Sequence, residues 1–152
     1  MNSRELSERT VIVTGGSKGI GKEAARQFAT AGADVAICSR NEDEITSAAD
    51  EINESDASGT VLGVRCDVTD ESDVTGFVDS VVDEFGPVDT LINNVGDSID
   101  DGKLHEIDEE TWDTNFEVNL KGTFLCSREV LPHMVERGGG SLVHISAINA
   151  QT

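Results

Sequence analysis

The sequence has no apolar run long enough to cross a membrane, and its first ten residues lack the apolar core of a signal peptide. It also lacks internal repeats, low-complexity tracts and linker-like segments. A chain of 152 residues without such divisions predicts one domain with one sizeable core. We therefore expect a soluble, cytoplasmic protein that does not associate with membranes.

Cysteine and histidine are both scarce, and neither is spaced as metal ligands are. The three cysteines, Cys38, Cys66 and Cys126, form an odd, scattered set without a Cys-x-x-Cys pair. The three histidines show no ligand spacing either. We predict no metal site, and we interpret the cysteines as small buried hydrophobes of a protein kept in a reducing compartment.

Basic residues are few: 11 Lys and Arg face 30 Asp and Glu, for a formal net charge of -19. An acidic tail for basic partners does not fit, because the acids are spread along the whole chain. Disorder does not fit the periodic apolar segments described below. We favour a halophilic protein adapted to high salt, where screening weakens the self-repulsion of an acidic surface. The same charge disfavours binding to nucleic acid, because it repels phosphates.

Apolar runs alternate with helical patterns along the whole chain. The runs predict strands at residues 10–14, 35–38, 61–66, 88–93 and 141–146. Between them, Asn41 and Asp70 are suited to cap helices, and Gly32 and Gly86 to end them. The longest helical pattern runs from about residue 109 to residue 137. This strict alternation predicts an α/β fold, with a parallel sheet built from right-handed βαβ units.

The first helical pattern follows the first strand directly. It places Ile20, Ala24, Phe28 and Ala31 at helical spacing. We predict that this side of the helix packs on the sheet.

Glycine is concentrated where the first strand meets this helix, since residues 14–21 read Thr-Gly-Gly-Ser-Lys-Gly-Ile-Gly. Without Cβ atoms a backbone can turn sharply and approach a pyrophosphate, and the helix N-terminus offers unpaired N–H groups to it. The alternative is a tight turn without a ligand. The strand before and the helix after favour a dinucleotide site. The candidate cofactor-binding residues of this loop are Thr14, Gly15, Ser17, Lys18, Gly19, Ile20 and Gly21.

The loop spacing, Gly-x-x-x-Gly-x-Gly, resembles the cofactor signature of the short-chain dehydrogenase/reductase family. Further similar segments follow in the order found in the family, namely Cys66-Asp67-Val68, Asn93-Asn94-Val95-Gly96, Val118-Asn119-Leu120 and residues 140–146. The resemblance covers essentially the whole chain. It implies a Rossmann-type doubly wound sheet with strand order 3-2-1-4-5, truncated before the C-terminal strands of the family.

The resemblance also implies roles for these segments. Asp67, together with Val68, would hold the adenine, and Asn93 and Gly96 would line the nicotinamide side of the cofactor. The activity implied is the interconversion of a small carbonyl compound and its alcohol. The segment that selects the substrate in the family is missing, so the substrate is left open. The full-length protein is expected to be a homo-oligomer, because helices flanking the fifth strand form the dimer interface in the family.

The choice between NADP and NAD depends on the end of the second strand. NAD-binding proteins usually present an acid there to the ribose 2′-hydroxyl. This chain has Ser39 followed by Arg40, which can hydrogen-bond to a 2′-phosphate and pair with its charge, and Lys18 adds a second cation. The alternative is that both cations are ordinary surface residues. We expect NADP(H) to be preferred over NAD(H).

Asn119 is a candidate catalytic residue in the long helical pattern. It shares a face with Trp112, Phe116 and Thr123. An amide on an apolar face is either a satisfied core residue or a functional one. The resemblance favours the second, with the amide holding water for proton delivery.

Ser146 is the second candidate catalytic residue. The family resemblance places the catalytic serine second of two polar residues after the fifth strand, where this chain has Ser146-Ala147. Read strictly, Ala147 occupies the catalytic position. Ser146 takes the role if the register shifts by one residue.

The sequence contains no tyrosine, whereas the resemblance implies a catalytic Tyr-x-x-x-Lys motif shortly after this serine. The tyrosine transfers the proton at the carbonyl oxygen, and the lysine lowers the tyrosine pKa. We therefore expect the 152 residues alone to be inactive. They are either part of a longer dehydrogenase, which we favour, or a noncatalytic dinucleotide-binding module. A methyltransferase shares the sheet but uses another loop spacing, so it is a weaker third hypothesis.

Overall fold

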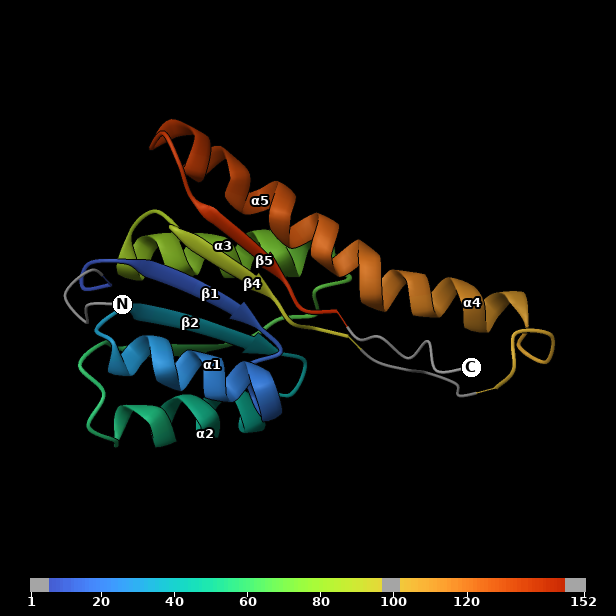
Figure 1. Ribbon diagram of the computed structural model, residues 1–152, viewed down its shortest axis with the longest axis horizontal. Helices are drawn as coiled ribbons and strands as arrows, with labels where there is room; N and C mark the ends of the chain where they lie inside the picture. The colour runs from blue at the N-terminus through green and yellow to red at the C-terminus, as the bar shows by residue number, and fades with distance from the viewer. Residues whose placement is uncertain (1–5, 97–101, 147–152) are drawn as a thin grey trace.

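The computed structural model describes residues 6–96 and 102–146, which form one parallel sheet with helices on both faces (Figure 1). The strand order β3-β2-β1-β4-β5 confirms the predicted order. Each predicted strand is present, with some ends shifted by one or two residues. In chain order the strands are β1 (Thr10–Thr14), β2 (Asp34–Ser39), β3 (Val61–Arg65), β4 (Thr90–Asn93) and β5 (Ser141–His144).

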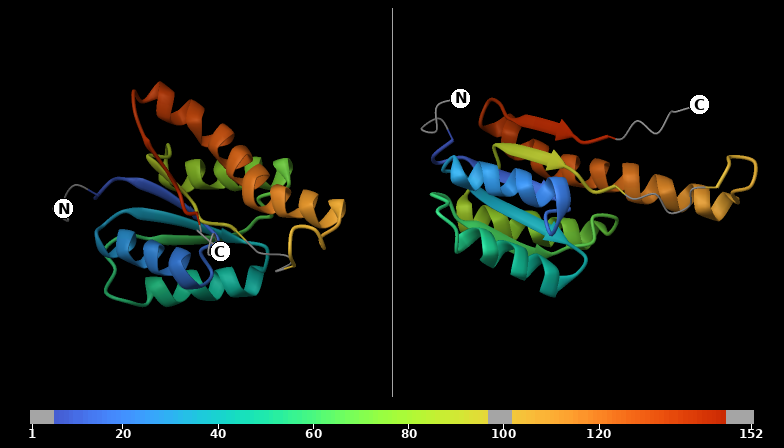
Figure 2. Two further views of the ribbon diagram at one scale, coloured as in Figure 1. Left: turned by 45° about the vertical axis from the view of Figure 1, so that its right-hand side comes forward. Right: turned by 60° about the horizontal axis from the view of Figure 1, so that its bottom comes forward.

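Helices α1 and α2 cover one face of the sheet, and α3 and α5 cover the other (Figures 1 and 2). A further helix, α4, and a π-helical turn, η1, precede α5 and extend past the carboxyl edge of the sheet (Figure 1). The bounds are α1 (Gly19–Thr30), α2 (Glu42–Asn53), α3 (Glu71–Phe85), α4 (Glu109–Phe116), η1 (Glu117–Lys121) and α5 (Gly122–Glu136).

Burial on both faces divides the core into two apolar clusters. Side chains of successive strand residues point to opposite faces, so Val11 and Val13 pack with α1 and α2, whereas Ile12 packs with α3 and α5. All three side chains are at most 1% exposed. Such two-sided burial explains why the first strand is an uninterrupted apolar run.

The predicted helix caps are confirmed. The Asn41 side chain accepts a hydrogen bond from the Glu44 N–H at 3.1 Å, and Asp70 accepts one from the Asp73 N–H at 2.9 Å. Each cap satisfies an N–H group that has no partner within the helix. Gly86, with φ of 87°, follows the last residue of α3, as predicted.

The predicted packing face of α1 is wrong. The buried residues are Gly21, Ala25 and Ala29, and Ile20 is 68% exposed. Small side chains on this face let the helix axis lie close to the sheet, whereas the prediction followed the larger apolar residues. Phe28 lies at the margin and packs only partly against the core.

The predicted uninterrupted helix over residues 109–137 is wrong at its centre, where η1 interrupts the α-helical spacing. The wider turn breaks the face predicted from α-helical spacing. Trp112 and Phe116 lie nearly half exposed, with their ring centroids 4.7 Å apart, while Asn119 and Thr123 are partly buried. No residue of α4, all of which is described, is buried.

The three cysteines are free and buried, which fits the predicted role as small hydrophobes. Burial raises the pKa of Cys126 to about 12, so its thiol stays protonated and unreactive near neutral pH. Among the described residues there is no cluster of His, Cys, Asp and Glu that would hold a metal ion. Over the same residues, no helix has both the length and the apolar character needed to span a bilayer.

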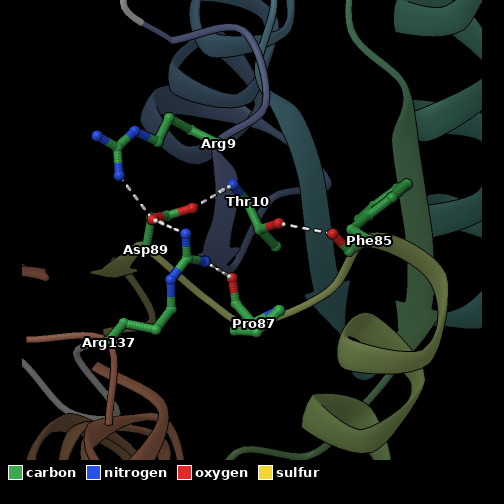
Figure 3. Close-up of polar contacts among 6 residues, drawn as sticks. All are labelled: Arg9, Thr10, Phe85, Pro87, Asp89 and Arg137. Atoms are coloured by element: carbon green, nitrogen blue, oxygen red, sulfur yellow. Dashed lines mark hydrogen bonds and ion pairs between the residues drawn. The ribbon is translucent and has the colours of Figure 1, made fainter. Parts of the chain in front are cut away.

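A buried carboxylate joins three parts of the chain at the amino edge of the sheet (Figure 3). Asp89 accepts hydrogen bonds from Arg9 Nη1 at 2.8 Å and from the Thr10 N–H at 2.9 Å. Arg137 Nη2 lies 3.5 Å from the same carboxylate, and Arg137 Nη1 donates to the Pro87 carbonyl at 3.0 Å. The end of α5 is thereby tied to the start of β1 and of β4.

We expect Asp89→Asn to lower the free energy of unfolding by about 2 kcal/mol, because it leaves two guanidinium groups without their shared anion. Both guanidiniums are partly exposed, so water limits the cost. Urea unfolding measures the effect. Glu23→Gln is the matched control, since it also removes one acid but from an exposed pair with Arg26. Equal stability of the two variants would contradict a structural role for the Asp89 cluster.

Candidate functional site at the carboxyl edge of the sheet

A cavity of about 550 Å³ lies at the carboxyl ends of the strands, where the loops after β1, β2, β3 and β4 converge. This is the switch point of the strand order, between β1 and β4, where open parallel sheets bind ligands. The structure brings the following predicted site residues together in its lining: Gly15, Ser17, Lys18, Ser39, Arg40, Asp67, Val68 and Gly96.

Glycine is required in the loop after β1 for two different reasons. Gly15 has φ of 66°, a left-handed conformation that other residues rarely adopt. At Gly21 a Cβ would lie 2.3 Å from the Gly15 carbonyl oxygen and 2.5 Å from Asn94 Nδ2. The loop therefore folds back on itself at Gly21, where there is no room for a side chain.

Thr14 and Asn94 fix this loop against the loop after β4. Thr14 Oγ1 accepts hydrogen bonds from the Asn94 N–H at 3.0 Å and the Val95 N–H at 3.3 Å. Asn94 Nδ2 donates to the Gly15 carbonyl oxygen at 3.2 Å. Thr14 is itself buried, so the structure places it behind the cavity wall, where it positions the loop.

The N-terminus of α1 differs from those of α2, α3 and α4. Those three helices each have a side-chain cap and acids in the first turn. Among the described residues no side chain caps α1, and its first turn, which includes Gly19, Ile20 and Gly21, holds no acid. Its first N–H groups and the positive end of its dipole therefore remain available for an anion.

Polar and cationic groups lie at the end of β2. Ser39 is the last residue of the strand, and its hydroxyl donates to the Asn41 carbonyl oxygen at 3.1 Å. Arg40 follows with an exposed side chain, and it shares the cavity lining with Lys18 of the first loop. The two cations predicted from the sequence thus lie in one cavity.

Asp67 is held as an anion at the end of β3. Its Oδ1 accepts hydrogen bonds from the Thr69 N–H at 3.0 Å and the Thr69 hydroxyl at 2.8 Å. Burial raises the pKa of Asp67, but these two hydrogen bonds and the charges of Arg40 and Arg65 lower it by more, so the net shift is downward. Val68, next to it, is buried and adds apolar surface to the lining.

Asn93 and Gly96 are separated by the structure. Gly96 lines the cavity, whereas the Asn93 side chain is buried outside it. Asn93 Nδ2 lies 3.1 Å from both Ser127 Oγ and His144 Nδ1. Asn94, the next residue, lines the cavity instead.

Neither of the two candidate catalytic residues, Asn119 and Ser146, lines the cavity. Asn119 is in η1, where its Nδ2 donates to the Asn115 carbonyl oxygen at 2.9 Å. Its Oδ1 packs against Gly96, because a Cβ there would lie 3.0 Å from it. Ser146 is exposed, just after Ile145, whose N–H donates to the Asn93 carbonyl. Ala147 lies outside the described residues.

The sequence did not single out several lining residues. Four of these residues lie in the segments that resemble the family, namely Cys66, Asn94, Val95 and Val118. The sequence therefore located the segments, but it did not show which of their residues line the cavity. Thr69 completes the turn that holds Asp67. Asn41 and Glu44 also line the cavity. The sequence predicted Asn41 as the cap of α2, but it did not predict that the first turn of this helix lines the cavity.

Comparison with known proteins identifies the fold and the family that the sequence motifs predicted. A family model described as short chain dehydrogenase matches residues 9–152. Cis-4-hydroxycyclohexanecarboxylate dehydrogenase from Sinomonas cyclohexanicum is 38% identical over 145 residues, which cover 94% of this chain and 56% of that protein. The chain spans about half the length of the curated relatives it matches.

Two solved structures are similar in sequence and shape. A short-chain type dehydrogenase/reductase from Mycobacterium ulcerans superposes with a TM-score of 0.89 and 34% identity, covering 94% of this chain and 52% of that one. A metagenomic short-chain oxidoreductase in complex with NADP gives a TM-score of 0.85 and 29% identity, covering 97% and 66%.

Proposed function

The chain belongs to the short-chain dehydrogenase family, and on that premise we propose that its cavity binds NADP(H) for the oxidation or reduction of a small alcohol or carbonyl compound. The observation that carries this proposal is the N-terminus of α1, which no described side chain caps. The loop that leads into this helix lines the cavity, and it has no room for a side chain at Gly21. A diphosphate satisfies the N–H groups of such a terminus and the positive end of its dipole.

The remaining lining fits the rest of the dinucleotide. Ser39, Arg40 and Lys18 would hold the 2′-phosphate, since a guanidinium pairs with phosphate through two parallel hydrogen bonds. Asp67 and Val68 would contact the adenine, and Gly96 would face the nicotinamide. Asn93 would support that end from behind the lining, through Ser127 and His144. The NADP complex of the metagenomic relative supports this choice of cofactor by similarity.

When bound, the reduced cofactor would supply a hydride and the oxidised cofactor would accept one, and this chain's part is to hold and orient it. Asn119 packs against Gly96, and by the family resemblance it would hold a water molecule near the nicotinamide end. Ser146 is the candidate for a hydrogen bond to the substrate oxygen. The sequence has no tyrosine for the proton transfer that the family uses, so we propose that residues 1–152 alone bind the cofactor without turnover.

A noncatalytic dinucleotide-binding module is the second candidate, since neither Asn119 nor Ser146 lines the cavity. NADPH consumption with a panel of ketones and aldehydes separates the two. Turnover by the full-length protein supports the oxidoreductase, and binding without turnover by that protein supports the module.

Assembly is proposed from the apolar surface of the last helices. The exposed apolar residues there are Trp112, Phe116, Leu120, Phe124, Leu131 and Val135. Apolar area of this kind is stabilised by contact with another protein surface, so we propose that the full-length protein is a homo-oligomer. Cytoplasmic location is proposed from the free, buried cysteines, which suit a reducing compartment.

We expect NADPH to bind at least about tenfold more tightly than NADH, and Arg40→Ala to remove most of that difference, because the guanidinium meets only the 2′-phosphate. Isothermal titration calorimetry with each dinucleotide measures both affinities. Arg26→Ala is the matched control, since Arg26 is exposed on α1, pairs with Glu23 and does not line the cavity. Equal affinities for NADPH and NADH would refute the NADP assignment, and failure of both to bind would refute the dinucleotide site.

A further inference from the structure

Glu44 is an acidic residue in the lining of the cavity that also contains the cations expected to hold the 2′-phosphate. The first turn of α2 carries three acids, Glu42, Asp43 and Glu44. Of these, Glu44 lines the cavity together with Ser39 and Arg40. Glu42 and Asp43, both among the described residues, line a separate depression along α2 instead. One acid of this turn therefore lines the proposed site, whereas Glu42 and Asp43 do not.

The charges of the cavity lining are balanced. Lys18 and Arg40 are cationic, and Glu44 and Asp67 are anionic. Arg40 already interacts electrostatically with Asp67, since its charge is one of the causes that lower the pKa of that carboxyl. A phosphate held by Arg40 would therefore bind in a cavity whose lining also includes acids from α2 and from the loop after β3.

We propose that Glu44 determines how strongly this site distinguishes NADPH from NADH, and that it makes this preference increase with salt concentration. The proposal rests on the proposed function, because it concerns the same cavity. The Glu44 carboxylate repels the additional phosphate of NADPH and has no such group to repel in NADH. Glu44 thus opposes Arg40 at the same subsite.

Salt weakens the repulsion between Glu44 and the phosphate more than it weakens the attraction between Arg40 and the phosphate. The Debye length falls from about 10 Å at about 0.1 M salt to about 3 Å at about 1 M, so repulsion between groups not in contact is largely lost. A guanidinium–phosphate pair is in direct contact and joined by hydrogen bonds, so it is screened less. Rising salt removes more repulsion than attraction, and the preference for NADPH grows. A site governed by Arg40 alone would show the opposite trend.

The fold permits a clean removal of this charge. Asn41 caps α2 through the Glu44 N–H, a backbone group that substitution of the side chain leaves in place. Glutamine also suits this position, three residues after the cap. Glu44 is exposed, so Glu44→Gln changes its charge with little change in packing.

The test is calorimetric titration of NADPH and NADH into the wild type, Glu44→Gln and Glu42→Gln, in about 0.1 M and about 2 M KCl. Glu42→Gln makes the same change in net charge on the same turn, away from the cavity. In low salt Glu44→Gln should raise NADPH affinity about fivefold and NADH affinity by less than about twofold. In high salt the gain should disappear. Glu44→Lys should raise NADPH affinity further in low salt.

Two results would overturn the proposal while NADPH still binds the wild type. One is an equal effect of Glu44→Gln and Glu42→Gln on the ratio of the two affinities, which would assign the salt trend to the overall charge of the molecule. The other is a gain for Glu44→Gln that persists unchanged in high salt. Failure of the wild type to bind either dinucleotide is a different outcome, because it removes the proposed function itself and this inference with it.

Discussion

Gly21→Ala should weaken NADPH binding about a hundredfold. The added methyl group would lie 2.3 Å from the Gly15 carbonyl oxygen and 2.5 Å from Asn94 Nδ2, so the loop must shift. The loop carries the N–H groups that we assign to the diphosphate. Each hydrogen bond to a charged group contributes about 1.5–3 kcal/mol, so misplacing two of them accounts for a change of this size.

The control for this variant is Gly76→Ala in α3. A Cβ at Gly76 has no neighbour within 4 Å, and Gly76 is exposed in the middle of the helix. Alanine there should raise the free energy of unfolding by about 0.5–1 kcal/mol and leave NADPH affinity unchanged. Circular dichroism establishes that both variants are folded. Wild-type affinity in a folded Gly21→Ala protein would show that the loop does not hold the phosphates.

The second large effect concerns salt. We expect the thermal midpoint to rise by more than about 10 °C when KCl increases from about 0.1 M to about 3 M. The reason is the formal charge of -19, whose self-repulsion favours the expanded chain and is screened by salt. Differential scanning calorimetry measures the change. A midpoint that stays flat over this range would end the hypothesis of a halophilic protein.

Salt also strengthens apolar burial, so a charge variant is needed to isolate repulsion. Asp43, Asp50 and Glu54 lie together along the exposed side of α2. Replacing them by Asn, Asn and Gln should raise the thermal midpoint in low salt and leave it nearly unchanged in high salt. An equal shift at both salt concentrations would point to helix propensity or local packing instead of charge repulsion.

The strand order and the position of the cavity could be predicted because few folds are compatible with the sequence patterns that indicate them. Alternating strands and helices fix a parallel sheet, and the residues of the first glycine loop locate its binding edge. Single side chains such as Asn41 and Asp70 also predicted where helices begin, because only a few residue types satisfy the first N–H groups.

The remaining features depend on contacts that a single sequence does not contain. On α1 the buried face is set by how closely the helix approaches the sheet, which favours Gly21, Ala25 and Ala29 over larger residues. The π turn at residues 117–121 has no buried residue, and the spacing of the apolar residues in the long helical pattern did not show it. Glu44 is one of three acids in the first turn of α2, and the sequence alone does not distinguish it from Glu42 and Asp43, which do not line the cavity.

The Asp89 cluster and the cavity lie at opposite ends of the same strands, since Arg9 and Thr10 lie at the start of β1 and the glycine loop follows its end. The contacts that stabilise the fold at Asp89 and the residues that line the cavity are therefore separate groups. Substitutions around Arg9 and Arg137 can therefore be used to raise the thermal midpoint of this protein. We expect them to leave its affinity for the dinucleotide unchanged. A library confined to that end should yield variants that differ in melting behaviour and share one binding constant.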